Sequence, residues 1–225
     1  MKLLILNPVG TEKWNQSDRE LFSKYASPEA EIYIASLERG PASLVTRKDY
    51  ADALPLVVEK ALRLCKDYDG LLVNCFLDPG VDVLKSLLEI PVVGPCEASL
   101  AVASLLGWKL GVVTVEGEGL SLIEERIRLL GFGNRLASLR YIDVPVLELD
   151  ADLGRTKGAL LRESKIAVEE GAEVVVLGCT GLAGLAEWLS GELGVPVVDP
   201  ALAALKMLET LVKLGLRQSE RRYRY

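Results

Sequence analysis

The chain repeats itself at an interval of about 105 residues, and this repeat constrains the fold more than any other feature. Residues 2–10, KLLILNPVG, resemble residues 109–117, KLGVVTVEG. The run that ends at Cys75 resembles the run that ends at Cys179, and 90–95, IPVVGP, resembles 195–200, VPVVDP. The offsets are 107, 104 and 105 residues. Three matches at a nearly constant offset indicate two similar lobes related by pseudo-twofold symmetry.

Short aliphatic runs alternate with longer helical patterns, which is typical of a parallel α/β sheet. The expected strands are 2–7, 31–36, 70–74, 91–93, 109–115, 139–144, 173–178 and 196–198. We therefore expect an α/β fold of two pseudo-symmetric parallel-sheet lobes, 1–100 and 101–204, with the active site in the cleft between them. The last helix, at about 202–214, and the tail to residue 225 are expected to join the first lobe, so that 205–225 belongs with 1–100.

Local signals predict where some helices begin and end. Ser17 and Glu20 form a capping-box pattern, and Gly131 is a typical helix stop. Asp78 and Pro79 predict an N-cap and a first helical position. Leucines between 182 and 193 predict one apolar helical face.

The chain contains no histidine. This excludes Ser-His-Asp and Cys-His nucleophile systems, His-containing zinc sites and His general bases. The cysteines at 65, 75, 96 and 179 form no C-x-x-C pair, and dinucleotide, P-loop and G-x-S-x-G motifs do not occur. Acid–base chemistry near neutral pH must come from Cys, Asp, Glu, Lys or Tyr, and we expect no metal and no cofactor.

Charge and hydropathy indicate a small-molecule substrate and a cytoplasmic protein. The net charge is −6 at pH 7 with acids and bases intermixed, which argues against nucleic acid as a partner. No apolar run approaches the ~18 to 20 residues that span a bilayer, and residues 1–8 are too short for a secretory signal. The basic and aromatic tail 217–225 is interpreted as a solvated end. A homo-oligomer is expected.

Cys75 and Cys179 occupy equivalent positions, each after a strand and before a helix. Both thiols are expected at the carboxyl ends of strands, where open α/β sheets bind ligands, and close to helix N-termini that favour the thiolate. Each cysteine alone is more simply a buried core residue. As a symmetric pair, they offer the two groups that racemisation needs on opposite faces of one carbon. Cys65 and Cys96 are given no catalytic role.

Several motifs carry a resemblance to a known family: 7–8 (NP), 40–43 (GPAS), 74–80 (NCFLDPG), 177–183 (LGCTGLA) and 194–199 (GVPVVD). On these the chain resembles the aspartate/glutamate/hydantoin racemase superfamily over nearly its whole length, and most of all its hydantoin/allantoin branch. The resemblance implies that Cys75 and Cys179 are catalytic. It also implies a set of substrate-binding residues: Asn7, Phe76, Thr114, Thr180 and Gly181. Glu97 matches a family glutamate to which no role is assigned.

The expected activity is cofactor-independent, two-base inversion of C5 in 5-substituted hydantoins or allantoin. Two loops depart from the branch: Val9 follows the Asn-Pro pair where Asn is common, and Leu44-Val45 stands where Ile-Glu is usual. Both loops are expected to shape the pocket and therefore to influence which substrate is bound. The alternatives are an aspartate/glutamate-type amino-acid racemase, a one-sided decarboxylase or isomerase, and a non-catalytic protein that binds a small ligand.

Overall fold

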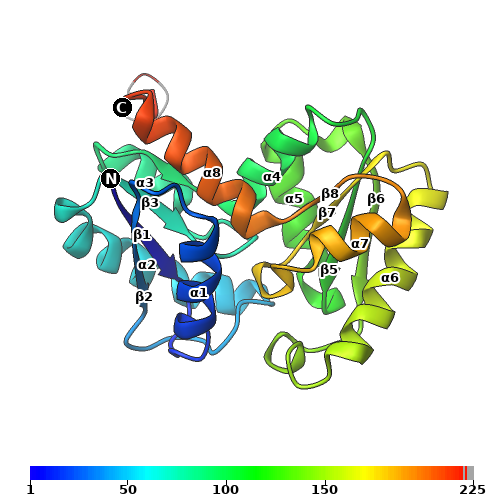
Figure 1. Cartoon of the computed structure of the whole chain (residues 1–225). Helices are drawn as coiled ribbons and strands as arrows, with labels where there is room; N and C mark the ends of the chain where they lie inside the picture. The colour runs from blue at the N-terminus through cyan, green and yellow to red at the C-terminus, as the bar shows by residue number, and fades with distance from the viewer. Residues whose placement is uncertain (220, 222–225) are drawn as a thin grey trace. The chain divides into compact units, whose positions relative to one another are not determined.

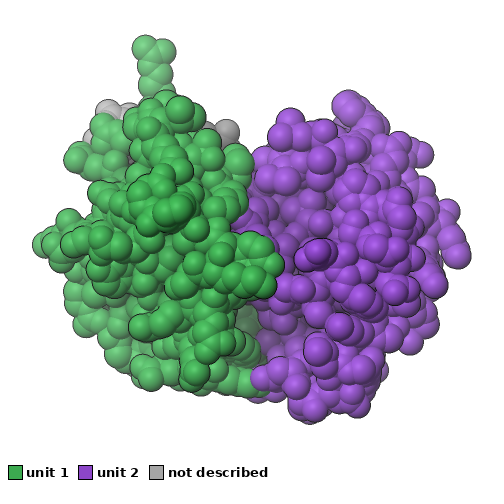
Figure 2. Space-filling model, viewed as in Figure 1, with its two compact units in different colours: residues 1–95, 204–225 green, residues 96–203 purple. Residues whose placement is uncertain are grey.

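The computed structural model describes residues 1–219 and 221, and its contacts divide the chain into two compact units (Figures 1 and 2). Unit 1 comprises residues 1–95 and 204–225, and unit 2 comprises residues 96–203. Each unit contains one four-stranded sheet in which every strand pair is parallel. No helix in the described part of the chain is long and apolar enough to cross a membrane.

The sheet of unit 1 has the strand order β2-β1-β3-β4. Its strands are β1 (Lys2–Asn7), β2 (Glu31–Ser36), β3 (Gly70–Val73) and β4 (Val92–Val93). Its helices are α1 (Asn15–Tyr25), α2 (Arg47–Leu64) and α3 (Val81–Leu87). The two central strands, β1 and β3, are buried along almost their whole length. Continuous apolar runs of this kind are expected where both faces of a parallel sheet are covered.

The sheet of unit 2 has the equivalent order β6-β5-β7-β8. Its strands are β5 (Leu110–Val115), β6 (Leu136–Ile142), β7 (Val174–Leu177) and β8 (Val197–Val198). Its helices are α5 (Leu120–Leu129), α6 (Leu153–Glu169) and α7 (Ala186–Leu193). Short 3₁₀ turns in the chain lie at Cys65–Asp67, Gly117–Gly119, Gly133–Arg135, Val146–Glu148 and Thr180–Leu182. The predicted α/β class with two similar parallel sheets is confirmed.

Two further helices carry the chain from one unit to the other. α4 (Pro95–Ala103) begins at the end of unit 1 and runs into unit 2, and α8 (Pro200–Lys213) begins in unit 2 and ends in unit 1. In unit 1, α8 packs against the start of β3, where a Cβ added to Gly70 would lie 2.8 Å from Leu208. The domain limits predicted from the repeat stay a prediction, because compactness does not show that either part folds alone.

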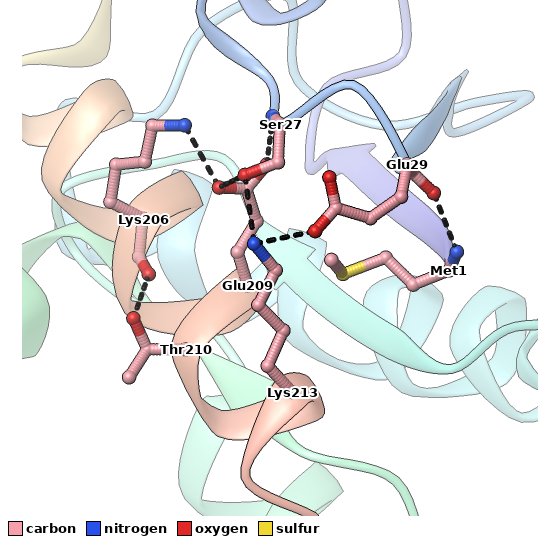
Figure 3. A network of polar contacts seen from close by, with 7 residues as sticks. All are labelled: Met1, Ser27, Glu29, Lys206, Glu209, Thr210 and Lys213. Atoms are coloured by element: carbon pink, nitrogen blue, oxygen red, sulfur yellow. Dashed lines mark hydrogen bonds and ion pairs between the residues drawn. The ribbon is translucent and has the colours of Figure 1, made fainter.

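A polar network fixes α8 to unit 1 (Figure 3). The buried Glu209 carboxylate accepts hydrogen bonds from the Ser27 amide (2.6 Å), the Ser27 hydroxyl (2.8 Å) and Lys206 Nζ (2.9 Å). Lys213 pairs with Glu29 at 2.7 Å. The segment between α1 and β2 is thus joined to a helix about 180 residues further along the chain.

Two local predictions differ from the structure. β6 begins at residue 136 and not at 139, and it ends before Pro145, which has no N–H to donate to a strand ladder. The capping box predicted at Ser17 is wrong: α1 begins at Asn15, and the Ser17 hydroxyl donates to the Trp14 carbonyl. A capping box does form at α2, between Thr46 and Asp49.

The carboxyl-terminal tail is only partly described. Gln218 Nε2 donates to the carbonyl oxygens of Leu88 (2.8 Å) and Ile90 (2.9 Å), so this part of the predicted solvated end is held against unit 1. The rest of the basic and aromatic stretch, at residues 220 and 222–225, lies outside the described residues.

Candidate functional site

Cys75 and Cys179 lie two residues beyond the ends of β3 and β7, the equivalent strands of the two sheets. In each unit the strand ladder continues by one bond up to the residue before the cysteine. The Asn74 amide donates to the Leu6 carbonyl, and the Gly178 amide donates to the Val113 carbonyl, both at 2.8 Å. Both thiols are half-buried, whereas the other two cysteines are buried in the core. The repeat in the sequence is therefore a repeat in local geometry.

Polar side chains gather at the carboxyl ends of β1, β2 and β3 in unit 1. Asn7 Nδ2 donates to Asp18 Oδ2 (2.8 Å) and to Asn15 Oδ1 (3.1 Å). Asn74 Nδ2 donates to Asn7 Oδ1 (2.9 Å) and, at 3.4 Å, to Asp18 Oδ2. Ser36 donates its hydroxyl to Asn15 at 2.6 Å. The amide of Asn7 is thus engaged at both its nitrogen and its oxygen, and it is linked to the residue before Cys75.

Asp18 is the ionisable member of this cluster. Burial raises the pKa of its carboxyl, the hydrogen bonds from Asn7 and Asn74 lower it, and the balance places the pKa at about 6. Sequence analysis did not identify Asp18, because it only appeared inside an apparent capping pattern. The α1 helix begins three residues earlier than that pattern predicted, and the Asp18 side chain accepts a hydrogen bond from Asn7 at the end of β1.

Unit 2 has a simpler arrangement at the equivalent place. The Thr114 hydroxyl, at the end of β5, donates to the Gly178 carbonyl at 2.8 Å. A Cβ on Gly178 would lie 2.7 Å from Thr114 Cβ, so only glycine fits before the cysteine. Asn7 and Thr114, both predicted to bind substrate, are 3% and 2% exposed and contact the residue that precedes a cysteine. Their contact with substrate stays a prediction.

The Cys179 thiol caps a 3₁₀ turn. Its Sγ accepts from the Gly181 amide at 3.4 Å. Burial raises the pKa of Cys179 to about 11; the amides of Gly181 and Leu182 lower it in part, and the Glu116 carboxylate raises it. The expected stabilisation of the thiolate by a helix N-terminus is therefore outweighed by desolvation. Thr180 is half-buried and Gly181 exposed.

Neither of the helices that follow the cysteines begins directly at its cysteine. α3 begins at Val81 after Gly80, whose φ is 76°, and the prediction of Asp78 as N-cap is wrong. Asp78 is 2% exposed and has a φ of 48°, a left-handed conformation that is uncommon for residues other than glycine. After Cys179, the predicted continuous helix is replaced by the 3₁₀ turn, and α7 begins only at Ala186.

A buried carboxylate joins the cysteine loop to the end of the fourth strand in each unit. In unit 1, Asp78 lies against Gly94, where an added Cβ would meet its Oδ1 at 2.2 Å. In unit 2 the acid and the glycine have exchanged places, so that the acid follows the fourth strand and the glycine lies in the cysteine loop. Asp199, just after β8, accepts a hydrogen bond from the Gly184 amide at 2.6 Å. Its other oxygen accepts from the amides of residues 201 and 202, the start of α8. From the sequence, Asp78 and Asp199 were noted only as members of the motifs at 74–80 and 194–199.

Two other residues singled out in the sequence have core or ion-pair contacts. Phe76 is 3% exposed, so almost none of its ring is open to solvent. Glu97 on α4 lies 3.8 Å from Arg126 on α5, and both side chains are mostly buried in unit 2. Among residues 1–219 and 221, no group of three or more His, Cys, Asp or Glu side chains could hold a metal ion.

Comparison with known proteins gives consistent relatives across the whole chain. A family model described as Asp/Glu/Hydantoin racemase matches residues 3–208. A hydantoin racemase of Paenarthrobacter aurescens is 34% identical over 223 residues, which is 98% of this chain and 94% of that protein. Another, from a Pseudomonas species, is 32% identical over 228 residues, covering 100% and 92%.

Solved structures agree with these relatives. The crystal structure of an allantoin racemase from Pseudomonas fluorescens matches with a TM-score of 0.95 and 34% identity, over 99% of this chain and 95% of that one. A glutamate racemase from Francisella tularensis has a TM-score of 0.69 and 15% identity, over 97% and 84% of the two chains. At that identity the second likeness concerns the fold alone.

Proposed function

Since the chain belongs to the Asp/Glu/Hydantoin racemase family, we propose that it inverts C5 of 5-substituted hydantoins or allantoin, with Cys75 and Cys179 as its two acid/base groups. The chain is an isomerase of the racemase kind, as are the hydantoin and allantoin racemases that match nearly its whole length. The alternative of a non-catalytic binding protein is therefore not retained. The substrate and the roles of the thiols are the substance of the proposal.

The observation that carries the thiol assignment is the equivalence of the two cysteines. Each is half-buried, each follows the third strand of its sheet, and each is preceded by a residue bonded to the end of the first strand. Inverting a carbon requires a base on one face and an acid on the other. One such group from each half of a repeated fold meets this requirement, provided that both sulfur atoms reach the same substrate carbon.

In the proposed reaction, one cysteine is a thiolate and the other a thiol. The thiolate sulfur takes the proton from C5, and the electron pair of the C–H bond moves into an enolate conjugated with the ring carbonyl groups. The opposite thiol then gives its proton to the other face of C5 and becomes the thiolate. The substrate of opposite hand uses the same two groups in exchanged roles. Backbone amides beside the thiol, such as that of Gly181, supply donors for developing negative charge.

The charged groups near the site favour an uncharged ring over an acidic amino acid. The carboxylate of Asp18 bonds to Asn7, and the Glu116 carboxylate raises the pKa of Cys179. Both charges would repel the side-chain carboxylate of aspartate or glutamate. An aspartate/glutamate-type racemase remains the second candidate, because family membership alone includes it.

A substrate panel tests the proposal. Single enantiomers of several 5-substituted hydantoins, allantoin, aspartate and glutamate would be incubated with the protein and followed by polarimetry, with the Cys75→Ala/Cys179→Ala double variant as control. We expect optical rotation to decay for at least one hydantoin or for allantoin, and not for the amino acids. Decay for aspartate or glutamate alone would transfer the chain to the amino-acid racemases.

A further inference from the structure

The carboxylate of Asp18 determines how two amide side chains are oriented. Its Oδ2 accepts from Asn7 Nδ2 and from Asn74 Nδ2, at 2.8 and 3.4 Å. An ionised carboxylate can only accept hydrogen bonds, so both amides must turn their NH₂ groups towards it. With Nδ2 of Asn7 held in this way, its Oδ1 faces Asn74 and accepts the 2.9 Å bond. Turning either amide would place two donors or two acceptors against each other.

We propose that Asp18 is a positioning residue that acts through Asn7 and Asn74 to fix the loop that carries Cys75. This inference rests on the proposed function, in which Cys75 exchanges a proton with the substrate. Asn74 is the link, because its side chain joins the cluster while its backbone is bonded to Cys75. The loop then closes with a hydrogen bond of 3.0 Å from the Asp78 amide to the Cys75 carbonyl. A shift of Asn74 would therefore move the thiol.

The two units differ in this respect, which gives the inference its internal control. In unit 2, a neutral hydroxyl from Thr114 makes the equivalent contact to Gly178. In unit 1, Asn74 donates directly to Asn7, and both amides also donate to the Asp18 carboxylate, whose protonation changes its hydrogen bonding. Removing the charge of Asp18 should thus affect Cys75 and leave Cys179 as it was.

Within the described part of the chain, the side chains that hydrogen-bond to Asp18 are uncharged amides. Asn7 approaches from β1, Asn74 from the loop after β3, and Asn15 lies one turn away on α1. Ser36, from β2, reaches the cluster through Asn15. Burial raises the pKa of Asp18 to about 6, against the hydrogen bonds from Asn7 and Asn74. The charge-assisted bonds to both amides are therefore present at neutral pH and are weakened as the pH falls through 6.

The test compares Asp18→Asn and Asp18→Ala with Glu20→Gln, an exposed acid on the same helix. Asparagine keeps an acceptor without the charge, and alanine removes the acceptor. Alkylation of Cys75 and Cys179 by iodoacetamide would be measured by peptide mass spectrometry from pH 5 to 8, together with kcat and KM for racemisation. The ratio of the two alkylation rates is the main readout, since Cys179 corrects for the general effect of pH.

For the wild-type protein and Glu20→Gln we expect the Cys75/Cys179 ratio to rise at least threefold as the pH falls through 6. For Asp18→Asn the ratio should be flat, at the level that the wild-type protein reaches below pH 6, with kcat at pH 8 lowered at least threefold. For Asp18→Ala the ratio should be raised at every pH, with kcat lowered tenfold or more and KM changed less than threefold.

Superposition of the Asp18→Asn ratio profile on that of the wild-type protein would overturn the inference, as would an Asp18→Ala variant with kcat and ratio both within twofold of wild type. Should Asp18→Ala not fold, by circular dichroism, the Asp18→Asn profile decides alone. If no substrate is racemised, the proposed function fails. The alkylation ratio still tests whether Asp18 positions the Cys75 loop, because that measurement requires no substrate.

Discussion

At the scale of single residues, the ionisation of Cys179 sets the conditions under which the proposed reaction can run. Burial raises the pKa of this thiol to about 11, and the acidic neighbour Glu116 adds to the effect, while the Gly181 amide opposes it. A thiol with a high pKa is a poor source of thiolate at neutral pH, but its thiolate is a strong base once formed. Proton abstraction by this residue should therefore become faster as the pH rises.

We predict that alkylation of Cys179 in the free protein accelerates about tenfold per pH unit from 7 to 9 without levelling off, because the thiolate is the reacting form. Glu116→Gln should at least double the rate at pH 8 by removing a negative charge beside the sulfur. Glu118→Gln, an exposed acid two residues away, should leave it unchanged. Peptide mass spectrometry gives the rates, and a plateau below pH 9 would contradict the raised pKa.

The residue scale also shows what could be predicted from sequence. The places of Cys75 and Cys179 at strand ends could be predicted, since a strand and the residue after it are adjacent in the chain. The partners of Asp18 could not, because they are 11 and 56 residues distant and meet only when β1 and β3 pair and α1 packs beside them. Asp78 and Asp199 were missed as links for the same reason.

At the scale of secondary-structure elements, the attachment of α8 depends on a buried acid. Burial raises the pKa of Glu209, but hydrogen bonds from Lys206 and Ser27 outweigh it and leave the pKa below the usual value. An acid with a lowered pKa stabilises the folded state above its unfolded pKa, and this contribution is lost as the pH falls through the folded value. The helix should be held firmly at neutral pH and less firmly in acid.

Glu209→Gln should lower the free energy of unfolding by about 1–3 kcal/mol at pH 7, because the side-chain NH₂ cannot accept both bonds from Ser27. Urea denaturation followed by circular dichroism measures the change, with the exposed Glu192→Gln as the matched control. The difference from wild type should shrink below pH 4. An equal loss of stability in both variants would show that the network adds nothing.

Elements with strong local signals were predicted well, and those with weak signals were not. The bounds of β1 and β2 match their aliphatic runs residue for residue. β6 was placed three residues late, because its first half, Leu136–Ser138, is short of β-branched residues. The S-x-x-E pattern at residue 17 predicted the wrong helix start. The observed N-cap is Trp14, whose side chain makes no capping hydrogen bond and therefore gives no signal in the sequence.

At the scale of the whole molecule, the repeated topology suggests that each half contributes one acid/base group. The strand orders of the two sheets are the same, and the cysteine follows the third strand in both. With only one thiol, a protein of this kind could still take a proton from one face of the substrate and return a solvent proton to that same face. Such a protein would exchange the C5 proton with solvent without inverting the configuration at C5.

Cys75→Ala and Cys179→Ala should each lower racemisation about 10²-fold or more, in the range expected for losing a general acid or base. In heavy water, each variant should still place deuterium at C5 of one enantiomer, with opposite choices in the two variants. Proton NMR and polarimetry on the same samples measure both quantities. Cys65→Ala, in the core, is the control. A variant within about tenfold of wild type, roughly 1.4 kcal/mol of barrier, would remove that cysteine from the mechanism.

The path of α8 has a consequence for dissecting the chain. The helix starts where Asp199 binds its first amides, yet Leu205 and Leu208, both 0% exposed, finish the packing of the opposite half. A fragment cut after residue 95 would lack this cover over β3 and would present bare apolar surface to water. Residues 96–203 form one uninterrupted stretch, but the first half is made of two separate segments and cannot be produced intact as one. An experimenter who wants the first half alone must splice residues 204–219 back onto it.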